Sequence, residues 1–228
     1  MKKILRVTGA LILWFLGLSV ALTLLYRFVP IPCTILMLQR CVEQKMDGRP
    51  LKLDKRWVPI ERMSRNLPWA VATAEDQKFE EHFGFDIEAI EKAAKYNERH
   101  HGRKVRGAST ISQQCAKNVF LWPSRNWARK GLEVYFTFLI ELCWSKERIM
   151  EVYLNVVEMG PGVYGAEAAS RYYFHKPAAR LTRVEAARIA AILPNPRRWS
   201  ASRPTPYIHR RTNWILSHMH DVDLKDLR

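Results

Sequence analysis

The feature that most constrains this chain is an uncharged apolar run near its beginning, which covers the 20 residues from Val7 to Tyr26. At a rise of ~1.5 Å per residue, a helix of this length crosses the hydrocarbon core of a bilayer, so the run predicts a transmembrane helix. Lys2, Lys3 and Arg6 precede it and predict a cytoplasmic N-terminus. The alternatives are a cleaved signal peptide, disfavoured because no small-x-small site follows, and a buried core helix, disfavoured by the terminal position.

The rest of the chain is expected to be one mostly α domain. A hydrophobic content of 48% excludes a disordered body. Strand signals are few, because we find no alternating apolar run and no Asn-Gly turn. Apolar periodicity and capping residues predict helices over 68–82, 86–101, 110–120, 129–144, 145–158, 166–173, 182–193 and 208–219. The expected organisation is a tail (1–6), a transmembrane helix (7–26), a polar, basic juxtamembrane linker (27–56) and the domain (57–228).

The formal net charge of +15 predicts an anionic partner. A nucleic acid, a membrane surface and a phosphate-bearing substrate all fit such a surplus. The four cysteines include no Cys-x-x-Cys pair, so a zinc site is not expected. Cys33 and Cys41 could form a disulfide in an oxidising compartment, and the sequence leaves this open. Cys115 and Cys143 lie in apolar helical patterns and are expected to pack in the core.

Two adjacent carboxylates, Glu75 and Asp76, follow the apolar stretch 69–74. On a helix over 68–82, Glu75 would share a face with Phe79 and His82, whereas Asp76 would be rotated by about 100°. The two carboxylates could then not act on one substrate atom. Partial desolvation would raise the pKa of Glu75 toward that of a working general base. An ordinary acidic helix end at the surface is the alternative.

A second cluster, from Arg106 to Asn118, combines hydroxyls, amides and a lysine. Thr110 and Gln113 have the spacing of a capping box at a helix start. Lys117 is expected on the same face as Gln113 and Gln114. Helix N-termini with hydroxyls and a cation suit phosphate, although a plain capped helix with a solvated lysine would give the same pattern.

A third cluster places Glu133 among basic residues at the start of an apolar segment, 129–144, which is expected to be a buried central helix. A buried carboxylate needs a partner, and Arg125, Arg129 or Lys130 could supply it. The sequence leaves open whether this is a structural ion pair or part of a binding site.

These stretches, together with a fourth one, resemble the peptidoglycan glycosyltransferase domain in order and spacing. The patterns are ED-xx-F-xx-H-x-G-x-D from Glu75, G-x-ST-x-x-QQ-xx-KN from Gly107, RK-xx-E from Arg129, E-x-YLN from Glu151 and G-x-x-x-A-x-x-x-YF from Gly165. Each pattern alone is weak to moderate evidence for the family, but the first four in this order are highly specific. The resemblance covers residues 59–199, with Ala108 replacing a glycine of many relatives. We find neither Ser-x-x-Lys nor Lys-Thr-Gly, so the chain resembles the monofunctional subgroup, without a transpeptidase site.

The resemblance implies a lysozyme-like, mostly α domain and a specific reaction. Lipid II would offer the 4-hydroxyl of its N-acetylglucosamine to C1 of the growing strand, with inversion and release of undecaprenyl pyrophosphate. Glu75 would be the general base and Glu133 a supporting catalytic carboxylate, while Lys117 and Arg125 would bind the pyrophosphate. The substrate-binding residues would be Asp76, Phe79, His82, Ser109, Thr110, Gln113, Gln114, Lys117, Asn118, Arg125, Arg129 and Lys130.

The same resemblance implies no obligatory cofactor, with room for Mg²⁺ or Mn²⁺ on the pyrophosphate. The expected partners are lipid II, the growing strand, the membrane and proteins of cell-wall synthesis or division, but no nucleic acid. The expected location is the inner membrane, with a periplasmic catalytic domain.

Two other functions compete with this interpretation. A glycan-cleaving muramidase would share the fold, but it has no pyrophosphate to bind and needs two carboxylates. A non-catalytic, membrane-tethered binder of anionic lipid or nucleic acid would explain the charge, yet the basic residues are scattered rather than gathered in one stripe.

Overall fold

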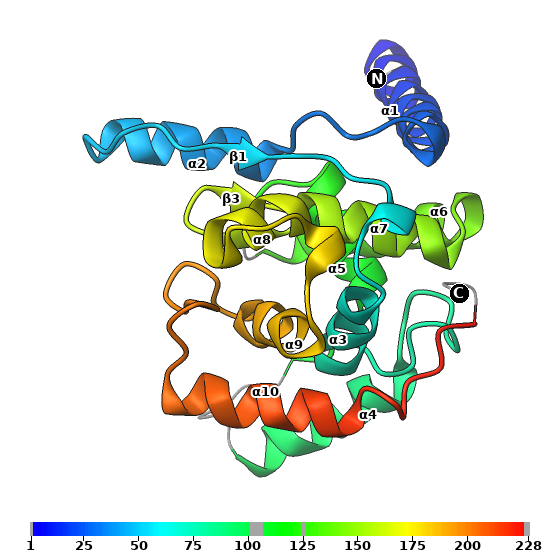
Figure 1. Cartoon of the computed structure of the whole chain (residues 1–228). Helices are drawn as coiled ribbons and strands as arrows, with labels where there is room; N and C mark the ends of the chain where they lie inside the picture. The colour runs from blue at the N-terminus through cyan, green and yellow to red at the C-terminus, as the bar shows by residue number, and fades with distance from the viewer. Residues whose placement is uncertain (1, 101–106, 125, 226–228) are drawn as a thin grey trace.

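The computed structural model describes residues 2–100, 107–124 and 126–225, and the chain is mostly helical, as predicted (Figure 1). The helices are α1 (Lys2–Phe28), α2 (Ile35–Met46), α3 (Asn66–Glu75), α4 (Ile87–Arg99), α5 (Ile111–Phe120), α6 (Trp127–Cys143), α7 (Lys146–Val156), α8 (Ala166–Phe174), α9 (Arg183–Ile192) and α10 (Pro206–His218). Two 3-10 turns, η1 (Ile60–Arg62) and η2 (Ala178–Arg180), and three short strands, β1 (Asp54–Lys55), β2 (Glu158–Gly160) and β3 (Val163–Tyr164), complete the order.

Capping side chains set where several of these helices begin. Thr110 caps α5 by accepting a hydrogen bond from the Gln113 backbone, and the Gln113 side chain accepts from the Thr110 N–H in return. The predicted capping box is therefore confirmed. Ser145 caps α7 in the same way, and Pro206 occupies the first turn of α10. Each such cap stabilises its helix by roughly 1 kcal/mol.

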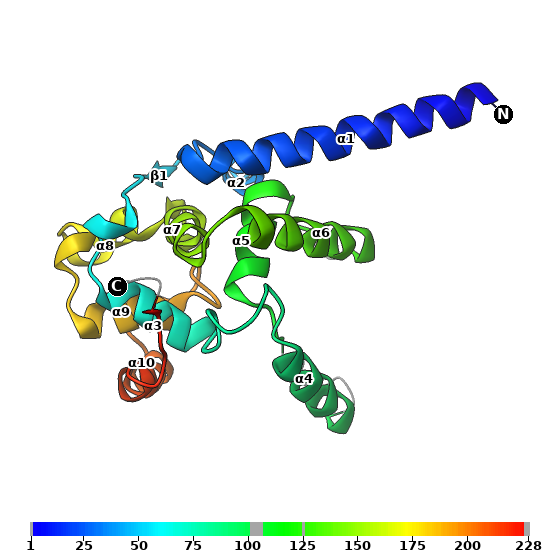
Figure 2. The same ribbon diagram turned by 90° about the vertical axis from the view of Figure 1, so that its right-hand side faces the viewer.

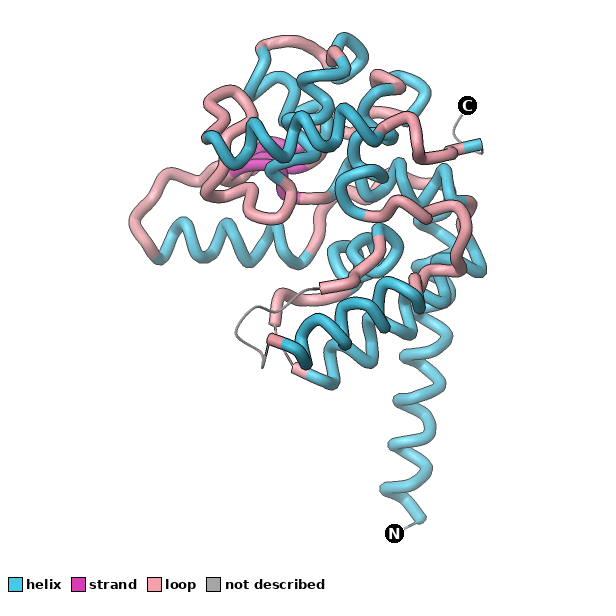
Figure 3. Tube along the Cα trace, turned by 90° about the horizontal axis from the view of Figure 1, so that it is seen from below, coloured by secondary structure: helices cyan, strands magenta, loops and turns pink. Residues whose placement is uncertain are grey.

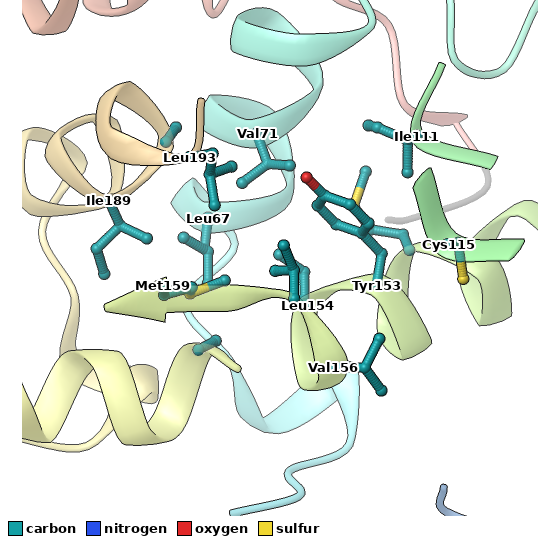
Figure 4. Close-up of a cluster of buried hydrophobic side chains, with 14 of the residues drawn as sticks. Leu67, Val71, Ile111, Cys115, Tyr153, Leu154, Val156, Met159, Ile189 and Leu193 are labelled. Carbon is teal, nitrogen blue, oxygen red and sulfur yellow. The ribbon is translucent and has the colours of Figure 1, made fainter. Parts of the chain in front are cut away.

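The core lies where α3, α5, α7 and α9 meet (Figure 4). Tyr153 of α7 stands at the centre of this cluster and is fully buried. The side chains around it come from all four helices: Leu67, Val71, Ile111, Cys115, Leu154, Ile189 and Leu193. α10 covers α9 and α3 on the outer side of this core. The core thus fixes the end of α3 against the start of α5.

The segment 27–56, predicted as a linker, contains α2 and β1 instead. β1 pairs in parallel with β3, and β2 pairs antiparallel with β3. Gly162, beside β3, has a φ of +68°, and a Cβ there would lie 2.4 Å from the Lys52 carbonyl oxygen. Strands of two or three residues are too short to show an alternating pattern, which is why the sequence did not predict them.

Helix α1 is the one element among the described residues that is long and apolar enough to cross a membrane, with a mean hydropathy of 2.1. It contains the predicted run 7–26 and extends beyond the rest of the chain at its N-terminal end (Figure 3). Its C-terminal half lies alongside α6 (Figure 2). Length and composition therefore agree with the predicted membrane helix.

Polar contacts attach the C-terminal half of α1 to the body of the chain. The Ser19 hydroxyl lies 2.6 Å from the Tyr135 hydroxyl, and the Trp144 indole N–H donates to the Thr23 carbonyl at 2.7 Å. The Arg148 guanidinium donates to the Tyr26 carbonyl at 2.8 Å, near the helix C-terminus, where a cation is favoured. Helix α1 is thus packed on the rest of the chain along its C-terminal half.

Helix α6 corrects one prediction. It was expected to be buried on all sides, but Val134, Phe138 and Leu142 are exposed. These residues are spaced by four, so they share one face of the helix. An all-round apolar pattern shows that a helix avoids water, and it does not distinguish burial in protein from exposure to lipid.

All four cysteines are free thiols in the structure. Cys115 is buried and Cys143 packs against the core, as predicted. Cys33 and Cys41, for which the sequence left a disulfide open, are both partly exposed.

Candidate active site

A cleft of about 680 Å³ opens where the end of α3 meets the starts of α4 and α5, with α10 along its border. Glu75 is the last residue of α3 and lines this cleft. Four of the other predicted site residues also line it: Asp76, Ser109, Thr110 and Gln114. The structure therefore brings the first two sequence clusters together at one opening.

The Glu75 carboxylate is held from two other helices. Oε2 accepts a hydrogen bond from Gln114 Nε2 of α5 at 2.9 Å. Oε1 lies 3.8 Å from Nη2 of Arg211, on α10. The Tyr153 hydroxyl donates to the Gln114 Oε1 at 3.3 Å, which turns the amide so that its NH₂ group faces Glu75. The carboxylate is thus oriented before any substrate arrives.

Burial is the main influence on the charge of Glu75 and raises its pKa above the ordinary carboxyl value. The side chain is only 13% exposed. The Gln114 hydrogen bond and the nearby charges of Arg211 and Lys117 partly oppose this effect, while Asp76 reinforces it. A carboxylate that is desolvated, oriented and open to a cleft has the properties of a general base, and the predicted rise in pKa is confirmed in direction.

Asp76 has a different environment from its neighbour. Its carboxylate accepts from the Ile111 N–H at the start of α5 at 3.0 Å and contacts His82 Nε2 at 2.9 Å. Its side chain is 2% exposed. The N-terminus of α5, which the sequence suggested for phosphate, is therefore occupied by a carboxylate of the chain itself.

The helix predicted over 68–82 ends at Glu75, so Glu75, Phe79 and His82 do not share a helix face, as we had expected. The chain turns at Asp76 because that residue is held to α5. Further on, Thr110 Oγ1 donates to the Gly84 carbonyl at 2.7 Å. Gly84 has a φ of +76°, which favours glycine, and a Cβ there would lie 2.7 Å from Thr137. These long-range contacts override the local helical pattern.

A second cleft, of about 460 Å³, lies at the C-terminal end of α5. Lys117, Asn118 and Arg129 line it, together with Arg40 and Leu36 of α2. Lys117 was expected on the same face of α5 as Gln113 and Gln114, and its spacing of three and four residues within the helix agrees with that expectation. Lys117 nevertheless lines the second cleft, whereas Gln114 lines the first and Gln113 belongs to the capping box. Burial lowers the pKa of Lys117 below the ordinary lysine value, with Glu133 and Glu75 opposing the shift.

Glu133 is buried and paired with two cations of its own helix. Arg129 Nη1 and Lys130 Nζ each lie 2.6 Å from one of its carboxylate oxygens. The ion pair that the sequence left open is therefore present, and it places Arg129 at the border of the second cleft. Both carboxylate oxygens of Glu133 are therefore engaged by cations of α6.

Phe79 and His82, which were also predicted for the site, are not among the residues that line either cleft. Phe79 is fully buried in the core, with the Lys146 ammonium 4.8 Å above its ring. His82 contacts Asp76, and its carbonyl accepts from Lys146 at 2.6 Å. Arg125 lies outside the described residues.

The fourth sequence pattern, which begins at Glu151, forms hydrogen bonds to residues 58–60 before α3. The Glu151 carboxylate accepts from the Ile60 N–H at 3.0 Å, and the Asn155 side chain bonds both backbone groups of Val58 at 2.9 Å. Tyr153, between them, orients Gln114. This pattern therefore supports the site without lining either cleft.

Sequence reasoning missed Arg211, which borders the first cleft, and Arg40, which borders the second. Both lie outside the region of resemblance, and neither stands in a pattern that would mark it. Only their positions in the fold could identify them.

The donor set of the clefts does not form a metal cage. Among the described residues, no three or more His, Cys, Asp or Glu side chains are grouped so that they could hold an ion. Asp76 is committed to Ile111 and His82, and Glu133 to its cations.

Comparison with known proteins agrees with this geometry. The sequence model of the family described as Transglycosylase matches residues 44–220. A protein of Pseudomonas entomophila (strain L48), named biosynthetic peptidoglycan transglycosylase, is 54% identical over 96% of this chain and 92% of its own length. Proteins with the same name from Pseudomonas syringae pv. syringae (strain B728a) and from Pseudomonas aeruginosa PAO1 are 51% and 52% identical, over 97% and 91% of this chain and 93% and 89% of their own lengths. The chain therefore belongs to the transglycosylase family, whose enzymes transfer glycosyl groups.

Proposed function

We propose that this transglycosylase polymerises the glycan strands of peptidoglycan from lipid II. The observation that carries the proposal is a pair of clefts that both include residues of α5: a desolvated, oriented carboxylate lines one, and the cations Lys117, Arg129 and Arg40 line the other. One base and one cationic site are what transfer from a pyrophosphate donor needs. The names of the similar Pseudomonas proteins support the same assignment.

In the proposed reaction, the acceptor lipid II lies in the first cleft. Glu75 removes the proton from the 4-hydroxyl of its N-acetylglucosamine while that oxygen attacks C1 of the N-acetylmuramic acid at the end of the growing strand. The new O4–C1 bond forms as the bond from C1 to the pyrophosphate oxygen breaks, and the configuration at C1 inverts. A general base of this kind contributes roughly 10²- to 10⁴-fold to the rate.

The second cleft would receive the donor pyrophosphate. Lys117 and Arg129 line it and would stabilise the negative charge that grows on the leaving group. Glu133 would hold Arg129 and Lys130 in place through its two 2.6 Å contacts. In the sequence, Arg125 comes directly after Ser124, which lines this cleft. We propose that Arg125 binds the pyrophosphate together with Lys117.

No obligatory cofactor is part of the proposal. If Mg²⁺ or Mn²⁺ takes part, it would bind through the pyrophosphate oxygens, because the described residues do not form a cage for it. Assays with EDTA and with each added metal test this point.

The structure contains an apolar helix, α1, that agrees with attachment to a membrane. We propose the inner membrane as the location, with the N-terminus cytoplasmic because Lys2, Lys3 and Arg6 precede the helix. The catalytic domain would then be periplasmic, where proteins of cell-wall synthesis or division are its proposed partners.

The experiment is a polymerisation assay with detergent-solubilised protein and fluorescent lipid II, resolved on a gel. Wild type is expected to form a ladder of glycan polymers, and Glu75→Gln to form none. Glu81→Gln, which removes an exposed carboxylate six residues away, is the matched control and should keep full activity. Shortening of preformed glycan with lipid II left intact would instead support a muramidase.

A further inference from the structure

Arg211 connects the last helix of the chain to the candidate base. It lies on α10, 137 residues after Ala74, and its Nη2 donates to the Ala74 carbonyl oxygen at 3.0 Å. The same nitrogen lies 3.8 Å from Glu75 Oε1. One guanidinium therefore contacts both the C-terminal turn of α3 and the carboxylate that this turn presents.

The opposite oxygen of Glu75 is held by an independent element. Gln114 of α5 donates to Oε2 at 2.9 Å, and Tyr153 of α7 donates to Gln114 in turn. With Arg211 removed, one carboxylate oxygen would keep its donor while the other would lose its cation. The two contacts can therefore be separated by mutation.

We infer that Arg211 is a positioning residue: from α10 it fixes the end of α3 and orients the Glu75 carboxylate in the first cleft. The inference rests on the proposed role of Glu75 as the base. It adds a residue of α10 that no pattern in the sequence analysis marked, in a helix that the family match, residues 44–220, also covers.

The charge on Arg211 also affects when Glu75 is ionised. Four groups face the carboxylate besides Arg211: Gln114 and Lys117 from α5, Tyr153 from α7 and the adjacent Asp76. Burial and Asp76 raise the pKa of Glu75, whereas Gln114, Arg211 and Lys117 lower it. Removing Arg211 leaves burial less opposed, so the base would ionise only at higher pH.

The size of this effect is limited by solvent. The Arg211 side chain is 26% exposed, so its attraction to Glu75 is partly screened. Loss of the Arg211 charge should still raise the pKa of Glu75, because burial, the largest influence, would then be opposed only by Gln114 and Lys117.

The test is the pH profile of the initial polymerisation rate at low lipid II concentration, measured with the full chain in detergent. Arg211→Gln should move the acidic limb to higher pH. Arg211→Lys keeps the positive charge, so its acidic limb should lie close to that of the wild type. Arg210→Gln removes the same charge from the adjacent, exposed position of α10, and it should leave the profile unchanged.

A readout that does not depend on turnover is the carboxyl ¹³C shift of Glu75, titrated in wild type and in Arg211→Gln. The midpoint should rise in the variant by the same amount as the acidic limb. A merely structural role for Arg211 would lower the rate at every pH and leave both midpoints in place, and that result would overturn the inference.

Glu75→Gln separates this inference from the proposed function. If Glu75→Gln polymerises lipid II at the wild-type rate, the base assignment itself is wrong. If Glu75→Gln is inactive while Arg211→Gln shows an unmoved acidic limb and an unmoved ¹³C midpoint, only the inference about Arg211 is wrong.

Discussion

The Asp76 carboxylate accepts a hydrogen bond from the Ile111 N–H at 3.0 Å, so a side chain of the protein itself supplies the anion at the start of α5. Glu75, one residue earlier, points instead to the first cleft and to Gln114. Two adjacent carboxylates therefore differ in function: Asp76 connects α3 to α5, and Glu75 remains available to a substrate.

Asp76→Asn should weaken the fold more than it changes the cleft. The substitution removes the charge that complements the α5 N-terminus and His82, and buried charge-assisted hydrogen bonds are worth about 1.5 to 3 kcal/mol. A loss of about 2 kcal/mol should lower the thermal midpoint by roughly 4 to 8 °C in a chain of this size. The control is Asp47→Asn, which removes the exposed carboxylate at the C-cap of α2 and should change the thermal midpoint little. Equal midpoints for the two variants would contradict the role given to Asp76.

Glu75→Gln should raise thermal stability at neutral pH while it abolishes activity. Burial holds the folded-state pKa of Glu75 above its unfolded value. Ionisation of Glu75 therefore lowers the free energy of unfolding of the wild-type protein. This loss of stability is complete above the pKa of Glu75 in the folded protein and absent below its pKa in the unfolded chain. The gain in thermal midpoint should accordingly appear at pH 7 and shrink toward acidic pH. A gain of the same size at every pH would show that ionisation is not its cause.

Lys117 should define the alkaline limit of activity if it binds the pyrophosphate. Its folded pKa is lowered by burial, so it loses its charge at a lower pH than an ordinary lysine. Lys117→Arg should keep activity to higher pH, because arginine stays protonated. Lys117→Ala should raise KM for lipid II by at least about tenfold, which corresponds to the ~1.4 kcal/mol expected from a lost charge-assisted contact.

Lys95→Ala is the control for Lys117, because Lys95 is an exposed lysine on α4. Its KM and its alkaline limb should match those of wild type. An alkaline limb that stays in place in Lys117→Arg would assign that limb to another group.

Trp144→Phe should weaken the attachment of α1 to the rest of the chain. It removes the indole N–H that donates to the Thr23 carbonyl at 2.7 Å and keeps an aromatic ring at the site. The loss of one buried hydrogen bond is worth about 1 kcal/mol, or roughly 2 to 4 °C in the thermal midpoint of the detergent-solubilised chain. Trp127→Phe, at a tryptophan that is 90% exposed, should leave the midpoint unchanged.

The sequence predicted most of the helices and the family, because both depend on local or ordered patterns. The capping box of Thr110 and Gln113 is contained within four residues, and the structure has it as expected. The four ordered patterns predicted a peptidoglycan glycosyltransferase, and the transglycosylase family match confirms the family. The raised pKa of Glu75 was also predicted, because an apolar stretch precedes it.

The prediction failed where distant contacts override local preference. The helix 68–82 stops at Glu75 because Asp76 is held by Ile111, 35 residues away. The linker 27–56 contains α2 and β1, and β1 gains its hydrogen bonds from β3, more than 100 residues later. Neither partner can be seen from the local pattern.

The sequence by itself determined the long apolar helix α1, the mostly α class and the family, since each is written in a run, a period or an ordered set of residue types. Only the tertiary structure decided that Lys117 and Gln114 serve different clefts, and that Arg211 meets Glu75. The reason is physical: a charge acts through space over a few ångströms whatever the separation along the chain, so contacts between distant helices cannot be read from local order.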